Sequence, residues 1–153
     1  MFKHVLLPTD GTELSEASVR AGIQLAREMG AKITALFVMP DNSNVVFYRA
    51  DALIANSNAE FAEAMNELAD KALAVVEQLA QQQGVPYVLQ RTEHVSPYKA
   101  IVEQAKAQGC DLICMASHGR RGLSGLLLGS ETQRVLTHTD IPVLVHRMPR
   151  STP

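Results

Sequence analysis

Short apolar runs alternate with longer stretches of helical periodicity, and this alternation constrains the fold more than any other feature of the chain. The apolar runs lie at residues 5–7, 32–38, 87–91, 111–116 and 141–146. Most of them are continuously apolar, as is typical of strands buried on both faces. Strands separated by helices pair in parallel and carry helices on both faces. The pattern predicts an α/β fold, a single doubly wound open sheet of five parallel strands.

Start and stop signals mark the expected helices between these runs. Thr12 is a suitable N-cap for the first helix, and Gly30 is suited to end it. Ser96-Pro97 offers a capping hydroxyl and then proline at the first helical position of a later helix. The weaker, alternating run at 87–91 is expected near a sheet edge. Residues 40–57 have no clean period, and we expect a loop or lid there.

The 153 residues are enough for one domain, which we expect to span residues 1–148, with a flexible tail at 149–153. The net charge of −2 gives no reason to expect a nucleic-acid partner or an anionic membrane surface. The N-terminal apolar run stops at Pro8, and no stretch approaches the roughly 20 apolar residues of a membrane span. These features predict a cytoplasmic protein.

The two cysteines, Cys110 and Cys114, are expected on one face of a strand. At about 3.3 Å per residue their Cα atoms would lie roughly 13 Å apart, which is too far for a disulfide. We therefore expect two buried thiols in a reducing compartment.

The loops that follow the first and fourth strands are the candidate binding segments. In an open doubly wound sheet, ligands bind beyond the carboxyl ends of strands, where the strand order reverses. Residues 8–11 follow the first strand, and residues 116–122 follow the fourth. If these two strands are neighbours, the loops face each other across one crevice.

The segment after the fourth strand has the chemistry of an anion site. Gly119, Gly122 and Gly129 permit positive φ and a close backbone approach. Gly129-Ser130 opens the last helix, so free N–H groups and the positive end of the helix dipole are expected there. Arg120 and Arg121 add positive charge. Together these features suit a polyphosphate, although glycines after a strand also serve turns alone.

Asp10, after the first strand, is placed to meet a ribose hydroxyl or a bound cation. The alternative interpretation is that Asp10 caps the first helix, and this role is compatible with binding.

The sequence resembles the universal stress protein family over nearly its whole length. The resemblance is carried by Val5–Asp10, Met115–Gly122, Leu127–Ser130 and Pro142–Val145. It implies a sheet of strand order 3-2-1-4-5, which places the first and fourth strands side by side. It also implies a homodimer formed through the C-terminal strand at 141–146, and a protein partner that the sequence does not identify.

The ATP-binding branch of this family carries the motif Gly-x2-Gly-x9-Gly-Ser/Thr. Here the second glycine is Gly119, and Gly129-Ser130 follows nine residues later. Ala116 replaces the first glycine. Alanine disfavours positive φ, so this departure is tolerated only if the backbone is extended at that position. We expect an extended backbone, because Ala116 closes an apolar run.

The resemblance implies that this chain binds ATP, with Mg²⁺ or Mn²⁺ on the phosphates. By position, Gly119, Gly129 and Ser130 would hold the phosphates, Asp10 the ribose, and the backbone of Val38 the adenine. Glu131 is awkward beside a polyanion unless it turns outward. The complete expected site is Pro8, Thr9, Asp10, Val38, Met115, Ala116, His118, Gly119, Arg120, Gly129, Ser130, Glu131 and Thr132.

Three alternatives to an ATP-binding regulatory protein remain open on the sequence. One is a slow ATPase, for which His118 is the only candidate base in the loop. Another is a dimeric interaction or signalling module that binds no nucleotide, which the replacement at Ala116 favours. The last is a carrier of a different adenine ligand, such as AMP.

Overall fold

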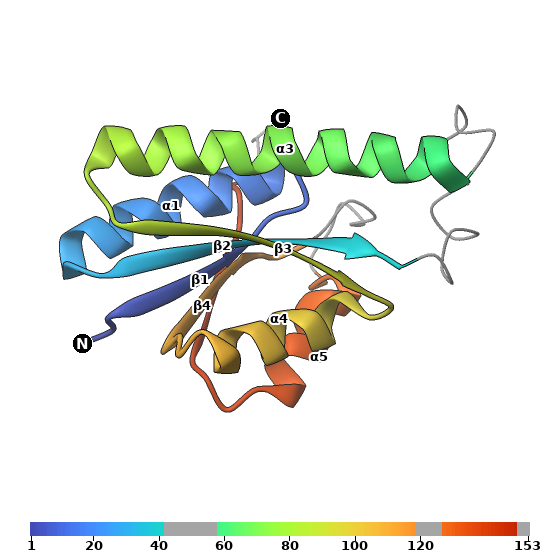
Figure 1. The fold of residues 1–153 in the computed structure, drawn as a ribbon. Helices are drawn as coiled ribbons and strands as arrows, with labels where there is room; N and C mark the ends of the chain where they lie inside the picture. The colour runs from blue at the N-terminus through green and yellow to red at the C-terminus, as the bar shows by residue number, and fades with distance from the viewer. Residues whose placement is uncertain (42–57, 119–126, 150–153) are drawn as a thin grey trace.

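The computed structural model describes residues 1–41, 58–118 and 127–149, and it contains one sheet covered by helices on both faces (Figure 1). The strands are β1 (His4–Pro8), β2 (Lys32–Pro40), β3 (Tyr87–His94), β4 (Leu112–Ala116) and β5 (Val143–His146). The helices are α1 (Glu13–Met29), α3 (Asn58–Gln83), α4 (Pro97–Ala107) and α5 (Ser130–His138). The strands are parallel in the order β3-β2-β1-β4-β5, which confirms the predicted fold and places β3 at an edge.

Two apolar cores lie on opposite faces of the sheet. Val5 and Leu7 of β1 pack into the core beneath α1 and α3, whereas Leu6 packs into the core beneath α4 and α5. All three side chains are fully buried. This alternation follows from the two-residue period of a strand whose two faces are both covered. β1 is therefore the shared centre of both cores.

Both cysteines are buried and free, as expected, but their predicted placement on one strand face is wrong. Cys114 belongs to the core under α1 and α3, and Cys110 to the core under α4 and α5. The reason is that Cys110 precedes β4 rather than lying in it. Burial raises the pKa of the Cys110 thiol to about 11 and also raises that of Cys114, so neither thiol is activated.

Helix α1 approaches the sheet closely because residue 22 is a glycine. A Cβ atom at Gly22 would lie 2.4 Å from Leu7 Cδ2, so with a larger residue there either the Leu7 side chain or the helix would have to shift. The predicted ends of α1 are confirmed. Thr12 is the N-cap and accepts a hydrogen bond from Ser15 N–H, and Gly30 ends the helix with φ of 63°.

The amino-terminal edge of the sheet is fastened by a carboxylate and a buried histidine. Asp111 accepts hydrogen bonds from the N–H groups of Lys3 and His4, which joins the start of β1 to the start of β4. His4 Nε2 forms a buried hydrogen bond of 2.8 Å with Oγ1 of Thr34, on the neighbouring strand β2. Burial, together with nearby Lys32, lowers the pKa of His4, which therefore stays neutral at neutral pH.

Among the described residues, no helix is both long enough and apolar enough to span a membrane.

Candidate functional site

The carboxyl ends of β1 and β4 lie next to each other at one edge of the sheet. The two strands pair directly, Val5 with Leu112 and Leu6 with Ile113. On either side of this pair, β2 flanks β1 and β5 flanks β4. The strand order thus reverses between β1 and β4, which is where an open α/β sheet forms its ligand crevice. The turn after β1 and the first residues after β4, Ser117 and His118, therefore begin at the same edge of the sheet.

The segment after β1 is a tight polar turn held by its own side chains. Asp10 Oδ1 accepts hydrogen bonds from Thr12 N–H at 2.9 Å and from Thr12 Oγ1 at 2.6 Å. Thr9 Oγ1 lies 3.1 Å from Ser15 Oγ, and both side chains are buried. Asp10 therefore supports the helix cap while Thr12 makes it. Both hydrogen bonds of the Asp10 carboxylate to described residues use Oδ1, so Oδ2 keeps its capacity to accept from a ligand.

Val38 presents backbone polar groups beyond the end of β1. The β1–β2 ladder ends with Pro8 opposite Leu36, and Thr9 N–H donates to Leu36 C=O at 2.9 Å. β2 itself continues to Pro40 along β3, two residues further than its expected end. Backbone groups alternate sides along a strand, so Val38 directs its N–H and C=O toward the β1 side, as Leu36 does. Among the described residues none bonds them there, so at the carboxyl edge beyond β1 they have no partner within this part of the chain.

The end of β4 is joined to the start of α5 by three hydrogen bonds. Gly129 N–H donates to Ser117 C=O at 2.8 Å. Thr132 Oγ1 donates to Ala116 C=O at 3.0 Å and to Ser117 C=O at 3.3 Å. Thr132 is buried, so its hydroxyl anchors the helix instead of standing open to a ligand. The Gly129–Thr132 segment is thereby fixed at the carboxyl end of β4.

The first turn of α5 supplies unpaired amides at this edge. The first amide of the helix to bond back is that of Gln133, which donates to Gly129 C=O. The preceding amides, those of Ser130, Glu131 and Thr132, have no intrahelical acceptor. Ser130 is exposed, so its hydroxyl stands beside these amides and is accessible to solvent. The predicted start of the last helix at Gly129-Ser130 is confirmed, and Gly129 has φ of −60°, so it does not use the positive φ that glycine permits.

Ala116 lies in β4 with an extended backbone, opposite His146 of β5. No described residue other than glycine has positive φ. The replacement of a motif glycine by alanine therefore causes no backbone strain at this position, as expected from its place at the end of an apolar run.

Glu131 turns away from the free amides of α5. Its Oε2 accepts the Tyr98 N–H at 2.8 Å, and its Oε1 lies 3.2 Å from Arg134 Nη1.

Two further predicted residues, Met115 and His118, lie at the end of β4. The Met115 side chain is buried and packs into the core under α4 and α5. His118 Nδ1 lies 2.9 Å from Ser117 Oγ, and its buried Nε2 has no hydrogen-bond partner among the described residues.

Four predicted residues lie outside the described part of the chain: Gly119, Arg120, Arg121 and Gly122. Residues 42–57, which make up most of the expected lid, also lie outside it. Sequence reasoning did not single out Ser15, Ser117 or Tyr98. The first two are small polar residues that the fold buries next to the candidate loops. Tyr98 contacts Glu131 through its backbone N–H, and a backbone contact of this kind leaves no signal in the pattern of side chains.

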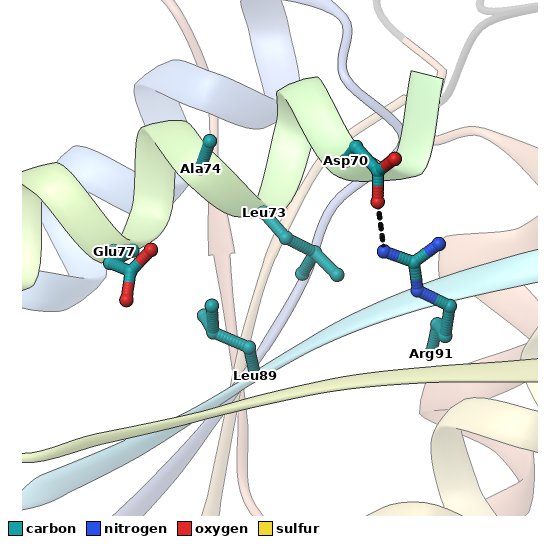
Figure 2. Close-up of a pocket in the computed structure, with 6 residues that line it drawn as sticks. All are labelled: Asp70, Leu73, Ala74, Glu77, Leu89 and Arg91. Atoms are coloured by element: carbon teal, nitrogen blue, oxygen red, sulfur yellow. Dashed lines mark hydrogen bonds and ion pairs between the residues drawn. The ribbon is translucent and has the colours of Figure 1, made fainter. Parts of the chain in front are cut away.

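Two hollows lie against α3 rather than between the carboxyl ends of β1 and β4. The larger, about 300 Å³, lies between α3 and the edge strand β3, where Leu73, Ala74 and Leu89 form its apolar part and Arg91 pairs with Asp70 (Figure 2). The smaller, about 170 Å³, lies between the turn after β1 and α3 and is lined by Thr9, Gly11 and Leu68 among others. Of the residues in the turn after β1, Thr9 and Gly11 line the smaller hollow, and none lines the larger one. Within the described residues, no cluster of three or more His, Cys, Asp or Glu side chains could hold a metal ion.

Comparison with known proteins gives a consistent result. The model of the universal stress protein family matches residues 1–147. Universal stress protein MJ0531 of Methanocaldococcus jannaschii is 33% identical over 150 residues, which cover 98% of this chain and 85% of the relative. The structure of MJ0577, from the same organism, has a TM-score of 0.74 at 25% identity and covers 99% of both chains.

A universal stress protein solved in complex with cAMP has a TM-score of 0.66 at 22% identity, over 95% of this chain and 97% of that one. At this identity the likeness shows a shared fold.

The extended backbone at residue 116 predicts the effect of restoring the motif glycine. We expect Ala116→Gly to lower the free energy of unfolding by about 1.5 kcal/mol, because glycine adds chain entropy and removes a buried methyl group. Urea denaturation measures this change. Ala35→Gly, at a buried alanine in β2, is the matched control and should cost a similar amount. A gain in stability from Ala116→Gly would mean that the alanine methyl is strained.

Proposed function

The chain belongs to the universal stress protein family, and we propose that it is a regulatory protein that binds ATP at the carboxyl edge of β1, β2 and β4. The observation that carries this proposal is a set of backbone groups at that edge that have no partner among the described residues. Val38 offers them on one side and the first turn of α5 on the other. Between them lies the crevice between β1 and β4.

Adenine recognition is assigned to the backbone of Val38. An adenine ring offers a donor at its exocyclic amine and acceptors at its ring nitrogens. The free N–H and C=O of Val38 match these two kinds of group. Val38 is also half-buried against the core under α4 and α5, so it supplies an apolar surface for the ring.

Phosphate binding is assigned to the first turn of α5. Free amides at a helix N-terminus, with the positive end of the helix dipole, form a site for phosphate oxygens. Ser130 adds a hydroxyl donor. The side chains of Glu131 and Thr132 bond elsewhere, so we assign a ligand role to their backbone N–H groups alone. Gly119 and Arg120 remain predicted phosphate ligands on the strength of the sequence motif.

Asp10 is assigned to the ribose, with Pro8 and Thr9 beside it. Its Oδ2 is suited to accept a hydrogen bond from a ribose hydroxyl, while Oδ1 keeps the turn closed. Mg²⁺ or Mn²⁺ would arrive with the triphosphate, because Mg²⁺ is commonly held by phosphates, waters and one or two carboxylates.

The relatives support a nucleotide as the ligand class. A universal stress protein with the same fold was solved in complex with cAMP, which is an adenine nucleotide, and this supports the proposal. The choice of ATP over AMP rests on the motif that ends at Gly129-Ser130 and on the anion chemistry of α5.

We further propose that the protein acts as a homodimer through β5. Within the described part of the chain, β5 pairs only with β4, so no described strand covers its other edge. Leu144 and Met148 are 45% and 46% exposed, and Leu136 of α5 is 42% exposed. An open strand edge with apolar side chains favours pairing with another strand, and a twofold axis would cover both edges at once.

The nucleotide proposal predicts a calorimetric result. Titration of the purified protein with ATP and Mg²⁺ should show one site per chain, and Ser130→Ala should weaken binding about fivefold through the loss of a charge-assisted hydrogen bond. Thr137→Ala, in the last turn of the same helix, is the control and should bind as the wild type does.

Parallel titration with AMP separates the two adenine ligands. Tighter binding of ATP supports phosphate recognition at α5, whereas equal binding places the affinity in the nucleoside part. If neither nucleotide binds at millimolar concentration, the proposal fails, and the protein is better described as an interaction module.

The dimer proposal predicts that Leu144→Lys raises the dimer dissociation constant at least about tenfold, because it buries an unpaired charge at the interface. Sedimentation velocity measures this change. Val88→Lys is the matched control, since Val88 is 48% exposed on the opposite edge strand, β3, and it should leave the dimer intact. A wild-type monomer at all concentrations would contradict the proposal.

A further inference from the structure

Glu131 lies in the first turn of α5, but its carboxylate caps another helix. The side chain is 34% exposed, and Oε2 accepts the Tyr98 N–H at 2.8 Å. Tyr98 is the second residue of α4. Its amide is one of those that α4 cannot satisfy internally. A residue of α5 therefore supplies the N-terminal cap of α4.

The cap that the sequence predicted for α4 is missing. Ser96 is the N-cap residue and Pro97 the first helical residue, as expected, but the Ser96 hydroxyl makes no capping hydrogen bond. The Ser96 backbone N–H instead donates to His94 Nδ1 at 2.8 Å. The side-chain oxygen at this helix end comes from Glu131, so α4 depends on α5 for its cap.

Arg134 and His138 strengthen the same connection between the helices. Arg134 Nη1 lies 3.2 Å from Glu131 Oε1, one turn along α5. The Arg134 guanidinium also lies 5.7 Å from the centre of the Tyr98 ring. The ring of His138 lies 4.9 Å from the Tyr98 ring, centre to centre. Tyr98 is thus held by its amide and by its ring, both against α5.

Adjacent residues fix the first turn of α5 in two directions. Thr132 binds it to the carbonyl groups at the end of β4, and Glu131 binds it to the start of α4. The amides assigned to phosphate binding belong to the same turn. Their direction is therefore set by these two anchors.

The carboxylate of Glu131 also has an electrostatic consequence for an anion. An acidic side chain in the first turn interacts favourably with the positive end of the helix dipole, and so competes with a bound anion. Here the carboxylate is turned to α4 and paired with Arg134. Its negative charge is partly compensated, and the free amides of α5 stay available.

We propose that Glu131 is a positioning residue for nucleotide phosphates, which acts by tying the first turn of α5 to the first turn of α4. This inference rests on the proposed nucleotide site. It assigns Glu131 no direct contact with the nucleotide through its side chain. It also makes α4 part of the support of the site, although no residue of α4 was predicted to belong to it.

Two pairs of variants separate the hydrogen bond from the charge. Glu131→Gln and Glu131→Ala both remove the charge, but only glutamine can still accept the Tyr98 N–H. Wild type and Glu131→Asp both keep the charge, but the shorter aspartate does not reach Tyr98. In each pair, the member without the hydrogen bond should bind ATP about fivefold more weakly by calorimetry.

Hydrogen exchange of the Tyr98 amide gives a readout that is independent of nucleotide. It should be about tenfold faster in Glu131→Ala than in Glu131→Gln, because the amide loses its acceptor. Equal ATP affinity within both pairs would overturn the positioning role. If exchange is faster in Glu131→Ala while the wild type binds no nucleotide, the proposed function has failed and the positioning role fails with it. If the wild type binds ATP and exchange is equal, the inference about Glu131 alone is wrong.

Discussion

The burial of β1 on both faces, between β2 and β4, is the constraint on which the rest of the structure depends. Val5 and Leu7 fill one core and Leu6 the other, so one short strand belongs to both. Because β1 lies at the centre of the sheet, the turn that connects β1 to α1 begins where the strand order reverses. This topology places the carboxyl ends of β1 and β4 side by side.

Early termination of β1 creates the free backbone of β2. β1 stops pairing with β2 at Pro8, while β2 continues along β3 to Pro40. A proline and a polar turn end β1, and the turn is closed by Asp10 and Thr12. The unpaired groups of Val38 therefore follow from a sequence feature of another strand. On the other side of the crevice, Thr132 and Glu131 fasten α5 so that its amides meet the same edge.

The fold could be predicted from sequence because its signals are local. Continuous apolar runs and helical periods indicated the strands and helices, and the strand order followed from the family resemblance. The core that a side chain enters was less predictable near strand ends, because it depends on where pairing with neighbouring strands begins. Cys110 precedes β4, so the alternation of strand faces did not apply to it. The missing Ser96 cap had a similar cause, since a carboxylate 35 residues away in sequence competes for the end of α4.

The candidate site was predictable in outline for a related reason. The residues after strand ends and the helix start at Ser130 are marked in the sequence by proline, glycine and small polar residues. The roles of Glu131 and Thr132 were not, because each depends on a contact between distant segments. Gly129 shows another limit, since a glycine permits positive φ but the sequence does not say whether the chain uses it, and here φ is −60°.

Amide chemical-shift mapping with ATP tests the central claim most directly, because it locates the ligand on the sheet. In ¹H–¹⁵N spectra of the labelled protein with Mg²⁺, the largest shifts should fall on the amides of Asp10, Val38, Ser130 and Glu131. These residues lie on three separate segments that meet only at the carboxyl edge of β1 and β4. Shifts confined to the hollow between α3 and β3, at Leu73, Leu89 and Arg91, would contradict the account.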